Sequence, residues 1–310
     1  MNKVSVIIPT YNCKQYLNKA LSSVVEQSHR DLEVIVIDDN SNDGSDELLQ
    51  YWASVDSRIK VLNQPGLGAS MARNIGIAQA TGDYIAFLDA DDFWLPNKIV
   101  DQLELHQFYP EIALSFTNYN HLTESYQEII DCFGYWDKFQ SETRRFLLLE
   151  QPLDFIIANN IIGTSTVMVK TDVLKQMKPF DSSFTYCEDW ELWLRICEKH
   201  SVAALNSVKT GYLMRQGSQT QSHEKRLANL ACIENILEKY QGYTHSQRPI
   251  RIAQARLLEG YADYHRELSQ HLTAMKLQCR SMFAHPQPRK LRSILGDCKR
   301  SLLTLAPACR

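Results

Sequence analysis

The chain has 310 residues, of which 44% are hydrophobic, and its formal net charge at pH 7 is −3. This length allows one large domain with a sizeable core, plus an appendage. The modest charge gives no sign of a nucleic-acid partner, and no apolar run approaches the roughly twenty residues that a membrane helix requires. Eight scattered cysteines without metal-like spacing, and no secretory leader, indicate free thiols in a reducing cytoplasm.

The first ninety residues alternate between strand-like and helix-like patterns. Strands are predicted at 4–8, 32–37, 59–62 and 84–88, and helices at about 14–27, 43–52 and 69–80. The first strand is a nearly unbroken apolar run, as expected of a strand covered on both faces, and Pro9 is predicted to end it. This alternation favours a doubly wound α/β fold with a mostly parallel central sheet flanked by helices.

Acidic residues follow two of these strands, as Asp38-Asp39 and as Asp89-Ala90-Asp91-Asp92. In an open parallel sheet, ligands bind in the crevice beyond the carboxyl ends of the strands. A divalent cation held by one or two carboxylates binds substrate phosphates there. Asp89 and Asp91 are two residues apart in a segment predicted to be extended, so both carboxylates are expected to address one site. The sequence therefore predicts a metal-dependent nucleotide site.

One glycine-containing string resembles a dinucleotide-binding fingerprint, but this interpretation is excluded. Gly66-Leu67-Gly68-Ala69-Ser70-Met71 lies between a predicted strand and a predicted helix, but Met71 occupies the third glycine position. The first strand, which usually carries such a fingerprint, turns without a glycine. A nicotinamide-binding function is not predicted.

Two further acids, Glu188 and Asp189, open a predicted helix. Trp190, Trp193, Leu194 and Cys197 follow with the spacing of a buried helical stripe. Carboxylates at a helix N-terminus are favourable on dipole grounds alone, so a purely structural role is one interpretation. The other is a general base that takes the proton from an attacking hydroxyl.

Five strings in this order resemble the motifs of the family 2 glycosyltransferases, which are inverting nucleotide-sugar enzymes with a GT-A fold. The strings are Val6–Asn12, Asp38–Ser45, Ala72–Gly76, Gly82–Asp92 and Cys187–Trp190. The resemblance covers roughly residues 2–222. It implies a GT-A glycosyltransferase domain over residues 1–222, followed by a helical C-terminal extension over residues 223–310.

The resemblance implies how the donor is bound. Pro9, Thr10 and Tyr11 are expected to hold the uracil or a related base, and Asp39 to accept a hydrogen bond from a base N–H. Arg73 is expected beside the diphosphate, where its guanidinium supplies planar, bidentate donors. Two alternatives stay open: the tyrosine only closes the sheet edge, and the arginine pairs with aspartates to hold the cleft together.

The resemblance also assigns the chemistry. It implies that Asp91 binds Mn²⁺ or Mg²⁺, that Asp89 contacts the sugar or ribose, and that Arg215 contacts phosphate. It makes Asp189 the general base, with Glu188 in support. The cation would act as a Lewis acid on the departing diphosphate.

Two stretches are less defined. Gly217 stands where family members often have a histidine, which puts a histidine metal ligand in doubt, and His223 is predicted to be a solvated loop residue. The stretch 159–169, which contains Gly163-Thr164-Ser165-Thr166, is expected to face the acceptor, but no single residue is assigned to that role.

From about residue 224 the sequence is dominated by helix formers, interrupted by Pro286 and Pro288. The last segment interleaves basic and apolar residues. Such a basic amphipathic helix lies on an anionic membrane face or packs on the catalytic domain. These residues are Arg289, Lys290, Leu291, Arg292, Ile294, Leu295, Lys299, Arg300, Leu302 and Leu303.

The sequence thus predicts an inverting transferase of cell-surface polysaccharide synthesis, in the cytoplasm or at the inner face of the membrane. Its donor is expected to be a nucleotide-diphosphate sugar, a UDP-sugar above all, and its acceptor a hydroxyl of a glycan or lipid-linked saccharide. The alternative is a non-catalytic subunit of the same fold that binds a nucleotide sugar or a glycan. Retention of Asp189 favours the enzyme, because a binding module has no need of a distant base.

Overall fold

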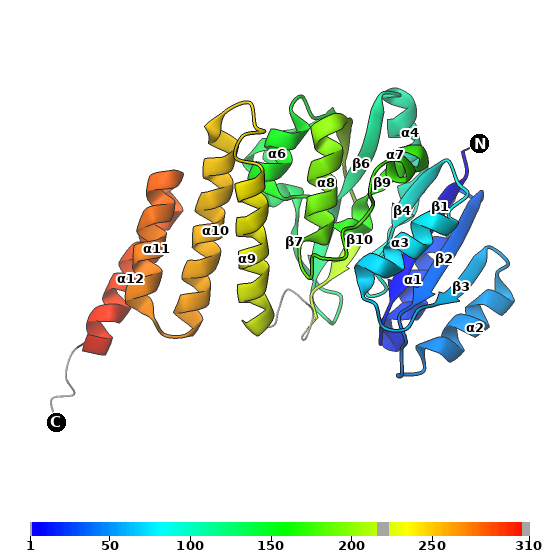
Figure 1. The fold of residues 1–310 in the computed structure, drawn as a ribbon, viewed down its shortest axis with the longest axis horizontal. Helices are drawn as coiled ribbons and strands as arrows, with labels where there is room; N and C mark the ends of the chain where they lie inside the picture. Colours follow the sequence, from blue (N-terminus) through cyan, green and yellow to red (C-terminus); the bar gives the residue numbers. More distant parts are fainter. Residues whose placement is uncertain (1, 216–222, 306–310) are drawn as a thin grey trace. The chain divides into compact units, whose positions relative to one another are not determined.

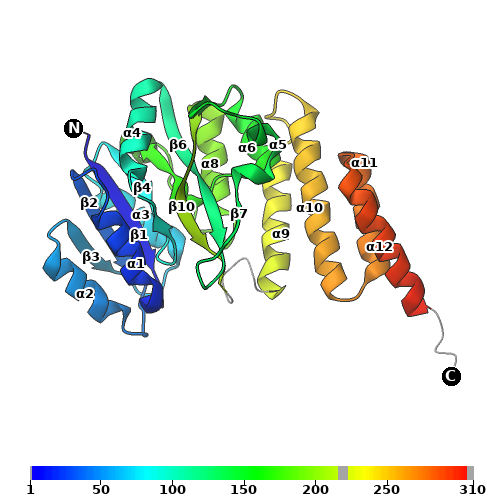
Figure 2. The same ribbon diagram turned by 180° about the vertical axis from the view of Figure 1, so that it is seen from behind.

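The computed structural model describes residues 2–215 and 223–305, which divide into two compact units (Figures 1 and 2). The first unit comprises Met1–Pro152 and Ile161–Arg215, and the second comprises Leu153–Asn160 and Gln216–Arg310. The first unit is an α/β domain and the second is helical. Each is described by itself below.

One sheet forms the centre of the first unit. Among the described residues its strand order is β3-β2-β1-β4-β9-β6-β10-β5, with β7 beside β6 and β8 beside β10. The four strands from β3 to β4 are parallel, whereas β9 runs antiparallel to both of its neighbours. The strands are β1 (Val4–Thr10), β2 (Leu32–Asp38), β3 (Ile59–Asn63), β4 (Tyr84–Phe87), β5 (Phe93–Trp94), β6 (Ile112–Leu122), β7 (Glu128–Asp131), β8 (Phe146–Leu148), β9 (Met168–Lys170) and β10 (Ser201–Leu213).

Helices flank this sheet, as the alternating pattern predicts. They are α1 (Lys14–Val25), α2 (Ser45–Val55), α3 (Ala69–Gln79), α4 (Lys98–Phe108), α5 (Asp137–Gln140), α7 (Thr171–Gln176) and α8 (Glu188–Lys199), with short 3₁₀ turns η1 (Phe133–Tyr135) and η2 (Thr164–Thr166). Val4, Val6 and Ile8 of β1 share a core with α1, α2 and α4. Side chains alternate between the faces of a strand, so Ile7 lies on the opposite face, which α3 covers.

The close approach of α3 to the sheet depends on Gly76. A Cβ atom built at this position would lie 2.5 Å from Ile7 Cγ2 and 3.1 Å from Ile37 Cδ1. Such distances are shorter than van der Waals contact, so only glycine fits without a shift. The helix is thereby held against β1 and β2, and its residue Arg73 is placed near the carboxyl ends of the strands.

The predicted end of the first strand is wrong by two residues. Pro9 lies within β1, paired with Ile37 of β2, and the strand continues to Thr10. The Ile7 carbonyl accepts a hydrogen bond from the Leu88 amide on the β4 side, and alternate residues of a strand point to the same edge. The missing N–H of Pro9 therefore faces the side on which β4 has already ended, so no ladder bond is lost.

The α8 region follows the predicted pattern. The four residues of the predicted stripe, Trp190, Trp193, Leu194 and Cys197, are all buried. Trp193 packs in an aromatic cluster, with its ring centroid 6.0 Å from that of Phe87 in β4 and 5.9 Å from that of Phe180. This cluster fixes the helix against the sheet close to its first turn.

The second unit consists of α6 (Pro152–Asn159), α9 (His223–Lys239), α10 (Gln247–Glu267), α11 (His271–Ala284) and α12 (Pro288–Leu305). The carbonyl of Ala158 in α6 accepts a hydrogen bond from Arg256 of α10 at 2.8 Å. Helix α9 begins at His223, which the sequence analysis placed in a loop, whereas Gly217 lies outside the described residues. Within 2–215 and 223–305, no helix is long and apolar enough to cross a membrane.

Candidate active site

The carboxyl ends of β1, β2 and β4 bring the first candidate residues together. Pro9 and Thr10 end β1 and Tyr11 follows it, beside Asp39, whose amide donates to the Thr10 carbonyl at 2.8 Å. The Tyr11 side chain is 58% exposed, so its ring is accessible for stacking. Thr10 is buried, and its hydroxyl has no hydrogen-bond partner among the described residues. Such a group is unusual in a folded protein and is expected where a ligand completes a site.

Asp39 fixes the loop that follows β3. Its Oδ1 accepts from Gln64 Nε2 at 2.6 Å and from the Leu67 amide at 2.8 Å, and its Oδ2 accepts from the Gly68 amide at 2.8 Å. Gly66 and Gly68 have φ angles of +75° and +86°, a region that glycine enters readily. A carboxylate offers about four acceptor positions. One position therefore remains for a base N–H, as the predicted role of Asp39 requires.

The acidic segment after β4 is a turn. The Asp92 amide donates to the Asp89 carbonyl at 3.0 Å, and the chain then enters β5. The prediction that Asp89–Asp91 is extended is therefore wrong. The chain turns here because it must reverse its direction between β4 and β5, which are not neighbours in the sheet. The carboxylates of Asp89 and Asp91 nevertheless interact: burial raises the pKa of Asp91, and the charge of Asp89 raises it further.

Arg73 of α3 bridges two of the candidate acids. Its Nη2 donates to Asp89 Oδ1 at 2.8 Å and its Nη1 to Glu188 Oε1 at 3.0 Å, although these acids are 99 residues apart in the sequence. The guanidinium is buried and lies 5.2 Å from the ring centroid of Phe180. Burial would lower the pKa of Arg73, but the two carboxylates outweigh it and raise the pKa. In this geometry Arg73 joins the acidic turn to the start of α8, and its contact with diphosphate stays a prediction.

Arg215 makes a similar bridge from the end of β10. Its Nε donates to Asp91 Oδ2 at 2.6 Å, and its guanidinium lies 5.4 Å from the ring centroid of Tyr16. Its Nη2 lies 3.8 Å from the sulfur of Cys13, a buried thiol whose pKa is raised to about 11, chiefly by burial. The structure thus brings Arg215 into contact with the predicted metal ligand.

Both carboxylate oxygens of Asp92 are engaged by the protein, so this residue has a structural role. It is buried, and its Oδ1 accepts from the Leu213 amide at 3.0 Å while its Oδ2 accepts from Ser165 Oγ at 2.6 Å. The same Ser165 hydroxyl accepts from the Asp89 amide at 3.0 Å, and the Ser165 carbonyl accepts from Trp94 Nε1 at 2.8 Å. The turn of the acidic segment is therefore bound to η2 and to β10.

The second pair of acids lies at the start of α8, as predicted. The helix begins at Glu188, after Cys187 with a φ of +59°. Asp189 Oδ1 accepts from the Trp190 amide at 2.7 Å, and its Oδ2 accepts from Thr164 Oγ1 at 2.9 Å. Since η2 also binds the acidic turn, Thr164 and its neighbour in sequence connect the candidate base to the turn that contains the candidate metal ligand.

The cluster carries more negative than positive groups. Its carboxylates are Asp89, Asp91, Asp92, Glu188 and Asp189, and its guanidinium groups are Arg73 and Arg215. Burial, and then neighbouring carboxylates, raise the pKa values of Asp91, Asp92 and Glu188. An added cation would relieve this repulsion.

These residues fit a divalent cation that is shared with a ligand. Carboxylate oxygens are the donors that Mn²⁺ and Mg²⁺ accept, and Asp91 keeps a side-chain exposure of 20%. Within the described ranges, no group of three or more His, Cys, Asp or Glu side chains is arranged to hold a metal. The remaining ligands would therefore come from phosphate oxygens and water, as is common for Mg²⁺.

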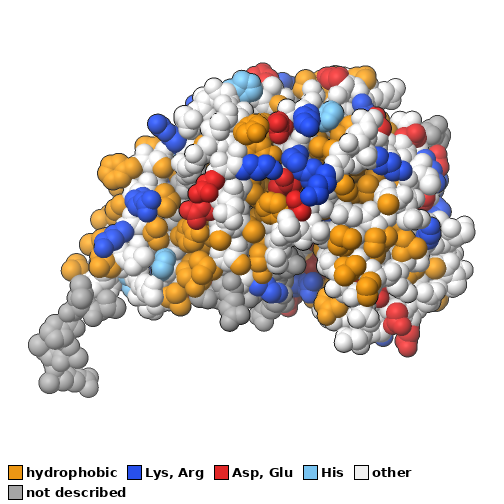
Figure 3. Space-filling model, viewed as in Figure 1, with side chains coloured by type: hydrophobic (Ala, Val, Ile, Leu, Met, Phe, Trp, Pro, Cys, Tyr) orange, Lys and Arg blue, Asp and Glu red, His pale blue; other side chains and the backbone are white. Residues whose placement is uncertain are grey.

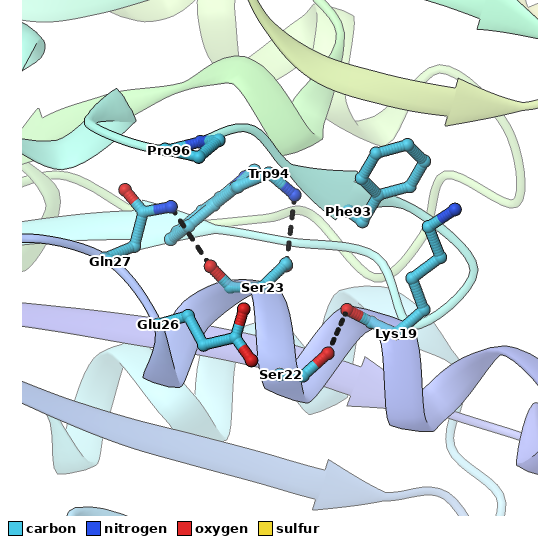
Figure 4. A pocket seen from close by; sticks show the side chains of 8 residues that line it. All are labelled: Lys19, Ser22, Ser23, Glu26, Gln27, Phe93, Trp94 and Pro96. Carbon is cyan, nitrogen blue, oxygen red and sulfur yellow. Dashed lines mark hydrogen bonds between the residues drawn. The ribbon is translucent and has the colours of Figure 1, made fainter.

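A separate hollow of about 220 Å³ lies between α1 and β5 (Figure 4). Lys19 lines it with its Nζ 4.0 Å from the ring centroid of Phe93, and Ser23 Oγ accepts from the Trp94 amide at 3.0 Å. None of the predicted site residues lines it. Its lining is Lys19, Ser22, Ser23, Glu26, Gln27, Phe93, Trp94 and Pro96.

Sequence reasoning left three positioning residues without a specific role. Thr164 and Ser165 were singled out only as small polar residues of an acceptor-facing stretch. Asn74 follows Arg73 and binds the main chain of Phe180 twice, donating to its carbonyl at 2.8 Å and accepting from its amide at 3.0 Å. No local pattern shows such contacts, because each joins segments that are distant in the sequence.

A mostly parallel α/β sheet with acids and arginines at its carboxyl edge, hydrogen-bonded to two acids on a helix, is the arrangement of the GT-A glycosyltransferases. The chain belongs to that group: residues 5–168 match the family model "Glycosyl transferase family 2". The family predicted from the sequence motifs is therefore confirmed, and so is the fold class.

Two relatives illustrate this membership, and one solved structure illustrates the fold. TuaG of Bacillus subtilis (strain 168), whose name assigns it as a glycosyltransferase to teichuronic acid biosynthesis, is 34% identical over 63% of this chain and 72% of its own length. WfgD of Escherichia coli, named as a UDP-Glc:alpha-D-GlcNAc-diphosphoundecaprenol beta-1,3-glucosyltransferase, is 32% identical over 72% of this chain and 82% of its own. The crystal structure of Staphylococcus aureus TarS 1–349 in complex with UDP-GlcNAc aligns with a TM-score of 0.64 at 17% identity, covering 96% of this chain and 89% of TarS 1–349.

Proposed function

We propose that this protein transfers a sugar from a UDP-sugar to a hydroxyl of a glycan or lipid-linked saccharide, with inversion, in cell-surface polysaccharide synthesis. One observation carries this proposal. Asp189, at the N-terminus of α8, is joined through Thr164 and its neighbour to the acidic turn that would hold the donor. A transferase needs a general base beside the donor, whereas a module that only binds a nucleotide does not.

The donor would lie along the carboxyl edge of β1, β2 and β4. Tyr11 offers an exposed ring for the base and Asp39 one remaining acceptor position, while Thr10 supplies a buried hydroxyl without a partner. Asp89 would contact the sugar or ribose. The guanidinium of Arg215, now bound to Asp91, would donate to the diphosphate.

A cation would be held by Asp91 and by donor oxygens. When bound, Mn²⁺ or Mg²⁺ supplies Lewis-acid stabilisation of the leaving nucleoside diphosphate. The protein side of the chemistry is proton removal: Asp189, held by the Trp190 amide and by Thr164, would accept the proton of the acceptor hydroxyl. Glu188 would support it by fixing Arg73. A single displacement of this kind inverts the anomeric centre.

The relatives support the substrate classes. The name of WfgD gives a UDP-sugar as donor and a diphosphoundecaprenol-linked sugar as acceptor, and the name of TuaG gives synthesis of teichuronic acid. A lipid-linked acceptor would place the enzyme in the cytoplasm at the inner membrane face, in contact with it through the C-terminal basic helix. Residues 1–222 would then act as the catalytic domain and residues 223–310 as a helical extension.

The test is a donor panel. UDP-glucose, UDP-GlcNAc, UDP-galactose, GDP-mannose and dTDP-glucose are offered with Mn²⁺, Mg²⁺ or EDTA, and release of the nucleotide is measured without acceptor and with a lipid-linked saccharide. The expected result is metal-dependent turnover of one UDP-sugar, and an α-linked donor should give a β-linked product by NMR. An α-linked product would refute the single displacement. Metal-dependent UDP-sugar binding without any turnover would favour the non-catalytic subunit.

A further inference from the structure

Helix α12 buries three polar side chains and exposes three leucines. Lys290 and Asp297 are each 1% exposed and Ser301 is 7% exposed. Three leucines of the same helix lie on the outside. The exposed fractions are 50% for Leu291, 69% for Leu295 and 65% for Leu302.

The buried polar side is fully engaged within the helical unit. Lys290 Nζ lies 2.8 Å from both Glu259 Oε1 of α10 and Ser281 Oγ of α11. Asp297 accepts from Arg266 Nε of α10 at 2.8 Å. A rotation of the helix that buried these leucines would break both ion pairs, and an unpaired buried charge is costly. The polar contacts therefore hold the leucines outward.

The leucines form one stripe. Leu291, Leu295 and Leu302 are spaced at i, i+4 and i+11, so they share one side of the helix. Phe283, near the end of α11, is 89% exposed. Single exposed apolar residues are normal, but a row of them on one helix marks an interaction surface.

The charge around this stripe has one sign. Residues 271–305 contain seven lysines and arginines and one acid, Asp297, although the whole chain carries a net charge of −3. Since that acid is buried and paired, the exposed charged side chains of α11 and α12 are all basic. Figure 3 shows hydrophobic and basic side chains over the end formed by these two helices. The exposed basic residues are Lys276, Arg280, Arg289, Arg292, Lys299 and Arg300.

We propose that α12 docks on an anionic lipid surface, with its leucine stripe inserted at the boundary of headgroups and acyl chains. Arg292 and Lys299 lie beside the stripe on the helix and would contact the headgroups. An apolar stripe flanked by basic residues on one helix is the arrangement of interfacial helices, and anionic lipid complements its charge. The inference deepens the proposed function, since this surface is where a lipid-linked acceptor would be met. It rests on that function for this purpose only.

The experiment is vesicle co-sedimentation of the full chain without donor or acceptor. Vesicles of phosphatidylcholine alone are compared with vesicles containing 30% phosphatidylglycerol, at 0.05 and 0.5 M NaCl. The apolar variant is Leu291→Gln/Leu295→Gln on α12. Its matched control is Tyr51→Gln/Val55→Gln on α2, which also changes two exposed apolar residues at i, i+4 spacing, here 60% and 56% exposed.

The wild type and the α2 control should bind the anionic vesicles and bind the neutral vesicles only weakly. Their binding to anionic vesicles should be lost at 0.5 M NaCl. The apolar variant should bind about ten-fold or more weakly, because two leucine side chains would no longer be removed from water on insertion. Arg292→Gln/Lys299→Gln should weaken binding at low salt roughly twenty-five-fold, since each basic residue near such a surface contributes about five-fold. That difference should shrink at 0.5 M NaCl.

Equal binding to both vesicle types, or equal binding by the apolar variant and the wild type, would overturn the proposal. So would a wild-type dimer that the apolar variant converts to a monomer while vesicle binding stays unchanged, since the stripe would then bind a second copy. Circular dichroism and thermal melting check that each variant is folded. Donor hydrolysis without vesicles is measured in parallel: loss of vesicle binding with intact hydrolysis touches only this inference, and the reverse touches only the proposed function.

Discussion

Replacing Asp189 by asparagine conserves the size of this side chain and removes its charge. The amide oxygen can still accept from the Trp190 amide, which lies 2.7 Å from Asp189 Oδ1, and the Thr164 hydroxyl can rotate to accept from the new NH₂ group. The structural loss is then the interaction of the carboxylate with the N-terminus of α8, about 0.3–1 kcal/mol. The catalytic loss is general-base assistance, roughly 10²- to 10⁴-fold in kcat, which corresponds to about 3–5 kcal/mol.

The two losses differ enough to be measured separately. Turnover of the UDP-sugar is followed by release of UDP, affinity for UDP by calorimetry, and stability by urea unfolding. The control is Asp46→Asn in the first turn of α2, which loses a comparable helix-terminal charge outside the site. We expect Asp189→Asn to match this control in stability and UDP affinity while turnover collapses. A parallel fall in stability and UDP affinity, with turnover reduced only in proportion, would show that Asp189 merely starts the helix.

Three further outcomes are expected. Asp91→Asn should abolish the strengthening of UDP binding by Mn²⁺ relative to EDTA, while its lost contact with Arg215, which is partly exposed, should cost no more than about 1 kcal/mol of stability in urea unfolding. Gly76→Ala should lower the free energy of unfolding by about 1–3 kcal/mol, because the new methyl group meets two isoleucines of the sheet. Its control is Gly296→Ala on α12, where the methyl group has open space and should be neutral or stabilising. Equal effects of the two substitutions would contradict the packing of α3. Burial lowers the pKa of His106 to about 3, so below pH about 6.5 the folded state binds fewer protons than the unfolded state. The free energy of unfolding should therefore fall by about 1.4 kcal/mol for each pH unit between 6.5 and 3. The variant His106→Gln should lack this part of the pH dependence when unfolding curves at pH 7.5 and 5.5 are compared.

The sequence was informative wherever structure depends on neighbours along the chain. Helix α8 begins at Glu188 and buries the predicted stripe, because helical spacing alone places those side chains on one face. The acids after β2 and β4 reach the same sheet edge for a similarly simple reason, since parallel strands share their carboxyl ends. Family motifs then supplied the predicted role of each residue, and those roles stay predictions.

Contacts between distant segments could not be predicted. Nothing in the local pattern pairs Arg73 with Glu188, and the turn after Asp89 follows from the position of β5 in the sheet rather than from residue spacing. The orientation of α12 is the clearest case. A helix is expected to bury its leucines. Here Lys290 and Asp297 face inward instead, because they form ion pairs with Glu259 and Arg266 of α10.

The hydroxyl and carbonyl of Ser165 join four segments, and this limits how acceptor specificity can be engineered. Its hydroxyl serves the acidic turn twice, and its carbonyl accepts from Trp94 and, at 3.3 Å, from the Thr210 hydroxyl. Residues 159–169 are predicted to face the acceptor, and a graft of this stretch that replaces Ser165 would also disturb the acidic turn. Exchanges that leave 164–166 intact and vary the chain on either side would test the predicted acceptor role of this stretch without moving the acids.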